Sequence, residues 1–247
     1  MTESTTTTTS TTSTTESTTT LTTRLTTTTT QYQRIPCSNN KYETETGIIN
    51  LNEHIMLTAE SQLKLEKEIR QKGDVALKEI SDLTCLEELT LSELEIEDIT
   101  PLSNLTNLEI LDLSNNSITD IKLLEKHDKL VELKLTYNPV TDIKPIKQNR
   151  KLQYLSLEYT RVSNIKPVEN LTQLRWLFLD GCPVSDIKPL QKLLNLRRLG
   201  LCDTKVLDTR TLKNLRNIEH ICLAQARISK EKCIQLDEEM PNTDITC

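Results

Sequence analysis

A 22-residue period dominates this chain. Seven consecutive segments share one pattern of apolar residues without an insertion or deletion, and they begin at Leu86, Leu108, Leu130, Leu152, Leu174, Leu196 and Ile218. In every segment the first, fourth and sixth positions are Leu or Ile, and the eleventh position is Ile or Val. A fixed period of this length is typical of stacked repeat architectures.

The apolar pattern predicts one short strand per unit, because the fourth and sixth positions lie on the same side of a strand. No unit can bury its leucines alone, so neighbouring units must stack, pair their strands in parallel and share a continuous core. After the strand, most units turn at an Asp or Asn followed by Ile, and a Lys or a Pro commonly comes next, as in Asp142-Ile143-Lys144-Pro145. The sequence therefore predicts an α/β solenoid, bent into an arc, whose repeats cover residues 86–227.

The pattern LxxLxLxxNxI in these units resembles the leucine-rich-repeat superfamily. The 22-residue length resembles the subclass shared by bacterial internalins and the leucine-rich regulatory subunit of type-one protein phosphatase. The resemblance implies a concave parallel β-sheet and convex 3₁₀ or irregular turns. It also implies inward residues at position 9 that bond neighbouring backbone, here Asn116, Asn138, Thr160, Cys182 and Thr204.

Two departures from the repeat concern single residues. Cys182 takes a position 9 site, so we interpret it as a buried structural residue rather than a reactive thiol. His127 and Asn149 replace the leucine that the resemblance implies at position 20, which suggests a looser convex side in the second and third units.

Both ends of a stacked repeat need a cap, because an uncovered terminal unit exposes apolar side chains and an unpaired sheet edge. Residues 58–85 predict a helical N-terminal cap, since Thr58 is a favourable N-cap residue and Gly73 a favourable terminator. Residues 228–247 predict a C-terminal cap with a helix and a short strand. Residues 1–30, mostly Thr and Ser, predict a disordered leader, and residues 31–57 a polar linker.

Composition disfavours several classes of function. The formal net charge of −6 opposes nucleic-acid binding, which needs a basic surface. The four glycines are isolated, so no glycine-rich phosphate loop exists, and the three histidines and seven cysteines follow no zinc-binding spacing. We therefore expect no enzyme, no cofactor, no metal site and no nucleic-acid partner.

Seven cysteines without a compact framework favour reduced thiols in a cytoplasmic protein. Cys202 and Cys222 differ by two strand positions, which predicts Cα atoms about 8 Å apart, beyond easy disulfide reach. A metal or thiol site is one interpretation of these two residues with His220; we favour the polar lining of a groove. With no signal-peptide pattern and no membrane-spanning run, we expect a cytoplasmic or nuclear monomer.

The candidate functional surface follows from the strand alternation, which directs positions 3, 5 and 7 outward onto the concave face. The single Trp and single Phe of the chain, Trp176 and Phe178, lie there beside Tyr154. These rings either pack only on one another or form an exposed interaction patch, which we favour because every inward site is already Leu or Ile. The candidate partner-binding residues are Tyr137, Tyr154, Tyr159, Trp176, Phe178, Arg198, Asp112, Glu132, Glu158 and Asp180.

The leading hypothesis is a non-enzymatic module that binds a protein or peptide on the concave face. The resemblance to the phosphatase subunit leaves open a regulatory subunit of a Ser/Thr protein phosphatase. The Thr-rich leader, acting as a stalk, leaves open a surface adhesin or secreted effector.

Overall fold

The computed structural model describes residues 48–51 and 54–247, in which ten strands form one sheet in sequence order. The expected leader and most of the expected linker lie outside the described residues. The strands are β1 (Ile48–Leu51), β2 (His54–Leu57), β3 (Glu88–Thr90), β4 (Ile110–Asp112), β5 (Glu132–Lys134), β6 (Tyr154–Ser156), β7 (Trp176–Phe178), β8 (Arg198–Gly200), β9 (His220–Cys222) and β10 (Asp244–Thr246). The fold is the α/β solenoid predicted from the period.

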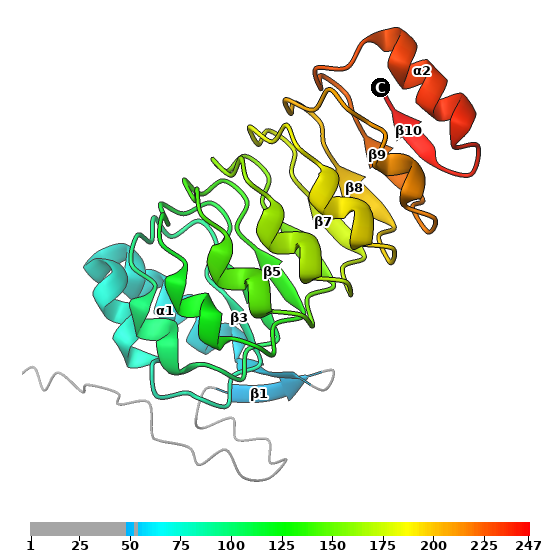
Figure 1. The fold of residues 1–247 in the computed structure, drawn as a ribbon. Coiled ribbons are helices and arrows are strands. Elements are labelled where there is room, and N and C mark those ends of the chain that lie inside the picture. The colour runs from blue at the N-terminus through cyan, green and yellow to red at the C-terminus, as the bar shows by residue number, and fades with distance from the viewer. Residues whose placement is uncertain (1–47, 52–53) are drawn as a thin grey trace, which may run out of the picture. The chain divides into compact units, whose positions relative to one another are not determined.

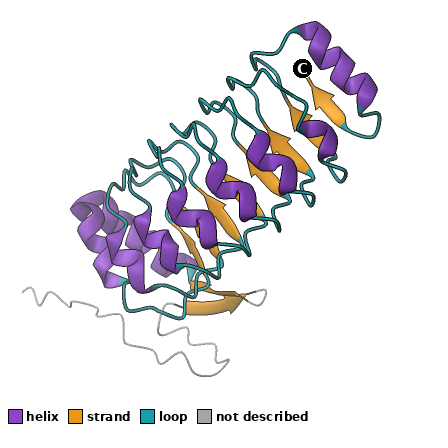
Figure 2. Ribbon diagram, viewed as in Figure 1, coloured by secondary structure: helices purple, strands orange, loops and turns teal. Residues whose placement is uncertain are grey.

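The short 3₁₀ helices run along the side of the coil opposite the sheet (Figure 1, Figure 2). They are η1 (Gly73–Glu79), η2 (Thr100–Asn104), η3 (Lys122–Lys126), η4 (Lys144–Gln148), η5 (Lys166–Asn170), η6 (Lys188–Lys192) and η7 (Leu212–Asn214). The side chain of the Asp or Asn at position 13 accepts a hydrogen bond from the backbone two residues later, for example from Lys144 N to Asp142 Oδ1 at 2.9 Å. This bond fixes the turn ahead of each of η2 to η7.

The register repeats the 22-residue offset at every junction from β3 to β9, where strands pair in parallel. Leu155 thus pairs with Leu133 on one side and Leu177 on the other, and all three side chains are fully buried. The inward placement of positions 4 and 6 is confirmed. The opposite side of the strands, which carries positions 3, 5 and 7, is called the sheet face below.

Residues at position 9 form a hydrogen-bonded ladder inside the coil. Asn138 accepts from Ile118 N at 3.0 Å and donates to Leu113 O at 2.8 Å, so one side chain ties two units together. Cys182 lies in the same ladder, with its thiol 2.9 Å from Leu157 O, and burial raises the pKa of that thiol. Cys182 is therefore structural.

The predicted looseness at position 20 is wrong. The imidazole of His127 is fully buried, with ring nitrogens 3.1 Å from Leu123 O and 3.3 Å from Leu102 O. Asn149 is also buried and donates to Leu124 O and His127 O. Polar side chains keep this region close-packed because they bond to backbone carbonyls that point into the coil.

The N-terminal end contains α1 (Ala59–Lys72), which begins after Thr58, whose hydroxyl accepts from Ser61 N at 3.2 Å. Residues 48–51 and 54–57 belong to the segment expected to be a polar linker, yet they form β1 and β2 instead. These strands pair antiparallel, and β2 pairs in parallel with β3, so they cover the first edge of the repeat sheet. Pairing that edge satisfies backbone groups. The strand residues themselves are mostly Ile, Leu and Met, which the prediction of a polar linker overlooked.

At the other end, α2 (Lys230–Glu239) follows the N-cap residue Ser229, and β10 pairs in parallel with β9. A disulfide joins Cys233 in α2 to Cys247, with Cα atoms 6.0 Å apart. No helix among the described residues has both the length and the apolar character needed to cross a bilayer.

Candidate functional site

Three aromatic side chains meet at the centre of the sheet face. Tyr154 lies on β6, whereas Trp176 and Phe178 lie on β7, and the strand register pairs Tyr154 directly with Trp176. The Tyr154 ring centroid lies 6.4 Å from that of Trp176 and 5.6 Å from that of Phe178, with tilted ring planes. All three are partly exposed, because Leu155 and Leu177 occupy the interior between them. We call Tyr154, Trp176 and Phe178 the aromatic cluster.

Lys134 adds a cation to one side of this cluster. Its ammonium lies 5.7 Å from the Tyr154 ring centroid, within the range of a cation–π interaction. The same nitrogen lies 2.8 Å from Glu132 and 3.5 Å from Asp112. Burial lowers the pKa of Lys134, but the hydrogen bond and charge of Glu132 outweigh it, so the pKa is raised overall. Two of the predicted acidic residues, Asp112 and Glu132, therefore share one lysine, whose charge offsets one of their two negative charges.

A second aromatic feature is the pair Tyr137 and Tyr159, whose rings stack with centroids 4.6 Å apart and planes 3° from parallel. Each tyrosine follows its strand at position 8 and has a left-handed backbone, with φ of 54° and 53°. In the next unit this position is Gly181, where a Cβ would lie 2.5 Å from the Tyr159 ring. Gly181 thus leaves room for the Tyr159 ring. Both tyrosines are about half exposed.

The remaining predicted acidic residues, Glu158 and Asp180, each accept a hydrogen bond within the chain. Glu158 accepts from the hydroxyl of the buried Ser156 at 2.8 Å. Asp180 turns toward the next unit, where its Oδ1 accepts from Cys202 N at 2.7 Å. Burial raises the pKa of Asp180. Asp112 and Glu132 thus contact Lys134, whereas Asp180 contacts the backbone of the next unit.

Arg198 lies at the start of β8 and is exposed. The register pairs it with Trp176, so a guanidinium lies on the strand next to the aromatic cluster. Arg197, its neighbour in sequence, instead forms an ion pair with Glu219 at 2.9 Å.

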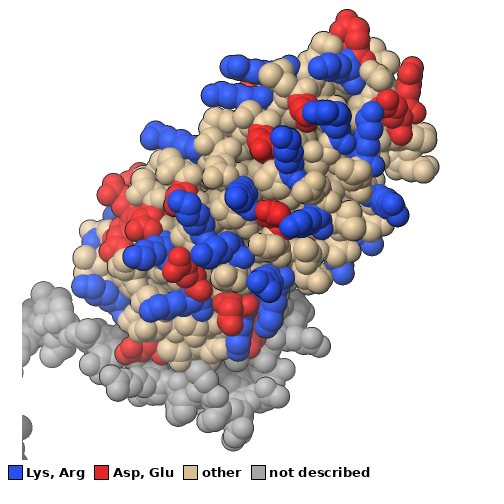
Figure 3. Space-filling model, in the orientation of Figure 1, with Lys and Arg blue, Asp and Glu red and all other residues tan. Residues whose placement is uncertain are grey.

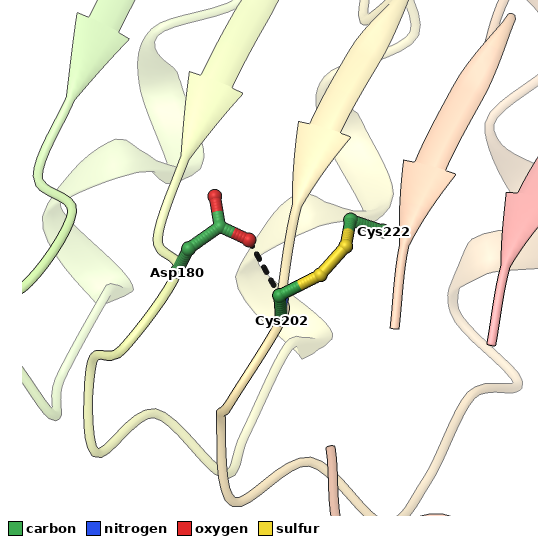
Figure 4. A group of neighbouring side chains, drawn as sticks. All are labelled: Asp180, Cys202 and Cys222. Carbon is green, nitrogen blue, oxygen red and sulfur yellow. Dashed lines mark hydrogen bonds between the residues drawn. A yellow bond between two sulfur atoms is a disulfide. The ribbon is translucent and has the colours of Figure 1, made fainter. Parts of the chain in front are cut away.

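The two cysteines on the last repeat strands correct two predictions. Cys202 and Cys222 form a disulfide with Cα atoms 5.3 Å apart, not the expected 8 Å (Figure 4). The expected distance of 8 Å assumed that the strand continues straight to Cys202. In the structure β8 ends at Gly200, and Cys202 lies in the turn beyond it. With the Cys233–Cys247 disulfide, four cysteines are paired, which contradicts the expectation of reduced thiols throughout.

The opposite side of the coil carries charges of both signs (Figure 3). The lysine at the start of each of η3 to η6 forms a stripe there, which we interpret as solubilising. An open hollow of about 480 Å³ between η5 and η6 is lined by Lys166 and Lys188 but also by Glu169 and Asp186. This balance of charge selects no ligand class.

Comparison with known proteins agrees with the repeat architecture. The family model described as "Leucine Rich repeats (2 copies)" matches residues 106–148. An internalin from Listeria monocytogenes is 30% identical with a TM-score of 0.65, over 68% of this chain and 49% of that one. Internalin C2 from the same organism is 27% identical with a TM-score of 0.59, over 70% of this chain and 73% of that one.

The chain is a leucine-rich-repeat protein.

Its 22-residue units are consistent with internalin-like repeats. This leucine-rich-repeat protein spans about half the length of the first internalin, so the activity of a whole internalin does not carry over directly. The ectodomain of a plant membrane receptor kinase from Arabidopsis thaliana, solved in complex with Casparian strip integrity factor 2, shares the fold at 23% identity and a TM-score of 0.55 over 61% of this chain and 20% of that one. No relative was found among the curated proteins.

Several features of this leucine-rich-repeat protein escaped the sequence analysis. The left-handed backbone at position 8 recurs in all seven units but is occupied by residues as different as Glu93, Tyr137 and Gln225. Gly181, Asn115 and Asp203 are the residue types that favour this conformation. Gly200 is the one glycine on the sheet face, and the Asp180 carboxylate occupies the space that a larger residue there would fill. This glycine was therefore the sequence signal for the position of Asp180.

Proposed function

We propose that this leucine-rich-repeat protein is an interaction module that binds a protein or peptide on the sheet face, centred on the aromatic cluster. Leucine-rich-repeat proteins are typically non-enzymatic interaction scaffolds. The observation that carries the proposal is the partial exposure of three adjacent rings on a face whose inward partners are fully buried leucines. Exposed aromatic side chains of this kind commonly provide most of the binding energy at protein interfaces.

The charges around the cluster favour a partner that presents apolar and cationic side chains together. Acidic residues outnumber basic ones at positions 3, 5 and 7 of the first six units. The acidic residues are Glu88, Asp112, Glu132, Glu158 and Asp180, and the basic residues are Lys134 and Arg198. Contacts of this kind exist within the chain, since the Lys134 ammonium lies close to the Asp112 and Glu132 carboxylates and to the Tyr154 ring. A partner lysine or arginine placed over Trp176 would make the same kinds of contact.

The substitution Trp176→Ala tests the location of the site. We expect it to weaken partner binding by at least about 2 kcal/mol, roughly thirtyfold in Kd, because it removes the largest exposed ring. The measurement is affinity capture from lysate with wild type and variant side by side, followed by titration of the retained partner. As Trp176 is the single tryptophan, its fluorescence should also shift to shorter wavelength on binding.

Leu207→Ala is the matched control, since Leu207 is an exposed apolar residue that lies outside the strands of the sheet face. It should leave binding unchanged. Equal capture by wild type and Trp176→Ala would place the site elsewhere and contradict the proposal.

One observation favours the alternative of a surface or secreted protein. Two disulfides are typical of proteins that mature in an oxidising compartment, and they count against the cytoplasmic expectation. Mass spectrometry of the chain after rapid alkylation in its native cells tests this: fully alkylated Cys233 and Cys247 would exclude the alternative. None of the relatives named above is a phosphatase subunit, so the phosphatase alternative gains no support from them.

A further inference from the structure

A cysteine pair and one carboxylate converge at the C-terminal end of the sheet face. The ligand atoms of Asp180, Cys202 and Cys222 all lie within 4.8 Å of one another (Figure 4). Asp180 follows β7, Cys202 follows β8, and Cys222 ends β9, so three consecutive units each contribute one group. All three residues are partly exposed on the solvent side of the strands, where small solutes can reach them.

Two features of the sixth unit hold the Asp180 carboxylate in place. Its Oδ1 accepts the hydrogen bond from Cys202 N at 2.7 Å. Its Oδ2 occupies the space where a side chain at position 200 would begin, because a Cβ at Gly200 would collide with that oxygen. The carboxylate is therefore aimed at the two sulfur atoms before any ligand arrives, and the glycine is what makes room for it.

We propose that reduction of the Cys202–Cys222 disulfide creates a site for a thiophilic divalent cation, with Zn²⁺ as the expected ion. The two thiolates and the Asp180 carboxylate supply three ligands, and water completes the tetrahedral coordination that Zn²⁺ prefers. Zn–S bonds of about 2.3 Å require the two sulfur atoms to separate to roughly 4 Å, which adjacent strands accommodate. The disulfide form has no thiolate to offer and does not bind the ion.

The chemistry balances with a dithiol as reductant. The S–S bond accepts two electrons and two protons and becomes two thiols, while the dithiol becomes a cyclic disulfide. Binding of Zn²⁺ then displaces the two protons to solvent. Transfer of the electrons to an oxidant such as a small-molecule disulfide releases the ion and restores the bond. The site is thus a cation site that opens and closes with redox state, independent of the partner-binding proposal.

The test uses the full chain and Co²⁺ as a spectroscopic substitute for Zn²⁺. After reduction by a phosphine and its removal under anaerobic conditions, wild type should bind one equivalent of Co²⁺ with thiolate-to-metal charge-transfer absorption, which Zn²⁺ then abolishes. The oxidised chain and Cys202→Ser should lack that equivalent. The double variant Cys233→Ser/Cys247→Ser, which removes both thiols of the other disulfide and leaves Cys202 and Cys222 in place, should retain it.

Two variants leave the cysteines intact and test the geometry. Asp180→Asn removes the ligand charge without changing its shape, and Gly200→Ala displaces the carboxylate without removing it. Each should weaken cation binding about tenfold or more while circular dichroism shows an unchanged fold. Co²⁺ binding that is the same in wild type, Cys202→Ser and Asp180→Asn would overturn the proposal, as would reduced wild type that binds no ion.

Discussion

His127 shows how a single polar residue is accommodated inside an otherwise aliphatic coil. A neutral imidazole has one N–H, yet both ring nitrogens of His127 face carbonyl oxygens. Protonation would satisfy both carbonyls, but burial outweighs this effect and lowers the pKa of His127 below its ordinary value of 6.5. The residue is therefore neutral in the folded protein at physiological pH.

This environment predicts a pH-dependent stability. Below about pH 6.5 the unfolded chain takes up a proton on His127 that the folded chain does not, so the free energy of unfolding falls as the pH falls, by at most about 1.4 kcal/mol per pH unit from this group. His127→Leu should remove that part of the slope. Denaturant unfolding of both proteins at pH 8, 7, 6 and 5 measures it.

At pH 8 the comparison is an internal control, since the imidazole is neutral in both states there. Parallel stability profiles for wild type and His127→Leu from pH 7 to 5 would show that His127 titrates alike in the folded and unfolded chain, against this account.

Among the elements, the C-terminal strand β10 covers the last edge of the repeat sheet. Thr246 O accepts from Leu223 N at 2.7 Å, and Glu219 O accepts from Asp244 N at 2.9 Å. The Cys233–Cys247 disulfide fastens the end of this strand to α2 across 14 residues. Without the bond, the short strand must hold its place by pairing alone.

Cys247→Ser should therefore lower the free energy of unfolding by about 3 kcal/mol, the value expected for a loop of this length. The loss should be local, with faster amide hydrogen exchange in β9 and β10 and little change in β4. Cys202→Ser serves as the control, because it opens the other disulfide but leaves α2 and β10 fastened. Unchanged exchange in β10 of Cys247→Ser would show that the disulfide does not stabilise the cap.

The elements differ in how far sequence alone specifies them. β3 to β9 and their turns follow from the period, because one-sided burial at positions 4 and 6 permits a single register. β1 and β2 lie before the first repeat, so the 22-residue period does not predict them. They form because β2 pairs with β3 at the first edge of the repeat sheet. The sheet face was also predictable as a set of outward positions. Its contacts were not, because the direction of Asp180 depends on the absent side chain of Gly200 and on a turn after β8.

In the molecule as a whole, stability is distributed along a line of similar junctions. Leu155 lies in the fourth of the seven units, fully buried between Leu133 and Leu177. Leu155→Ala should cost about 2–5 kcal/mol, through lost burial and the cavity left behind. Because each unit contacts chiefly its neighbours, hydrogen exchange should accelerate most in β5, β6 and β7.

Leu155→Met, which keeps the side-chain volume, is the matched control and should cost less than about 1.5 kcal/mol. An equal gain in exchange rate at every strand from β3 to β9 in Leu155→Ala would instead indicate all-or-none unfolding of the entire coil.

The uninterrupted register also determines which rearrangements of the gene the protein tolerates. Recombination that removes or duplicates one whole 22-residue unit keeps the strand register. A shorter insertion shifts the leucines that follow it away from the inward positions. Excision of residues 152–173 would bring β5 against β7 and set Lys134 opposite Phe178. The protein can thus lengthen or shorten by whole coils, and each such event rewrites its outer surface while the interior stays the same.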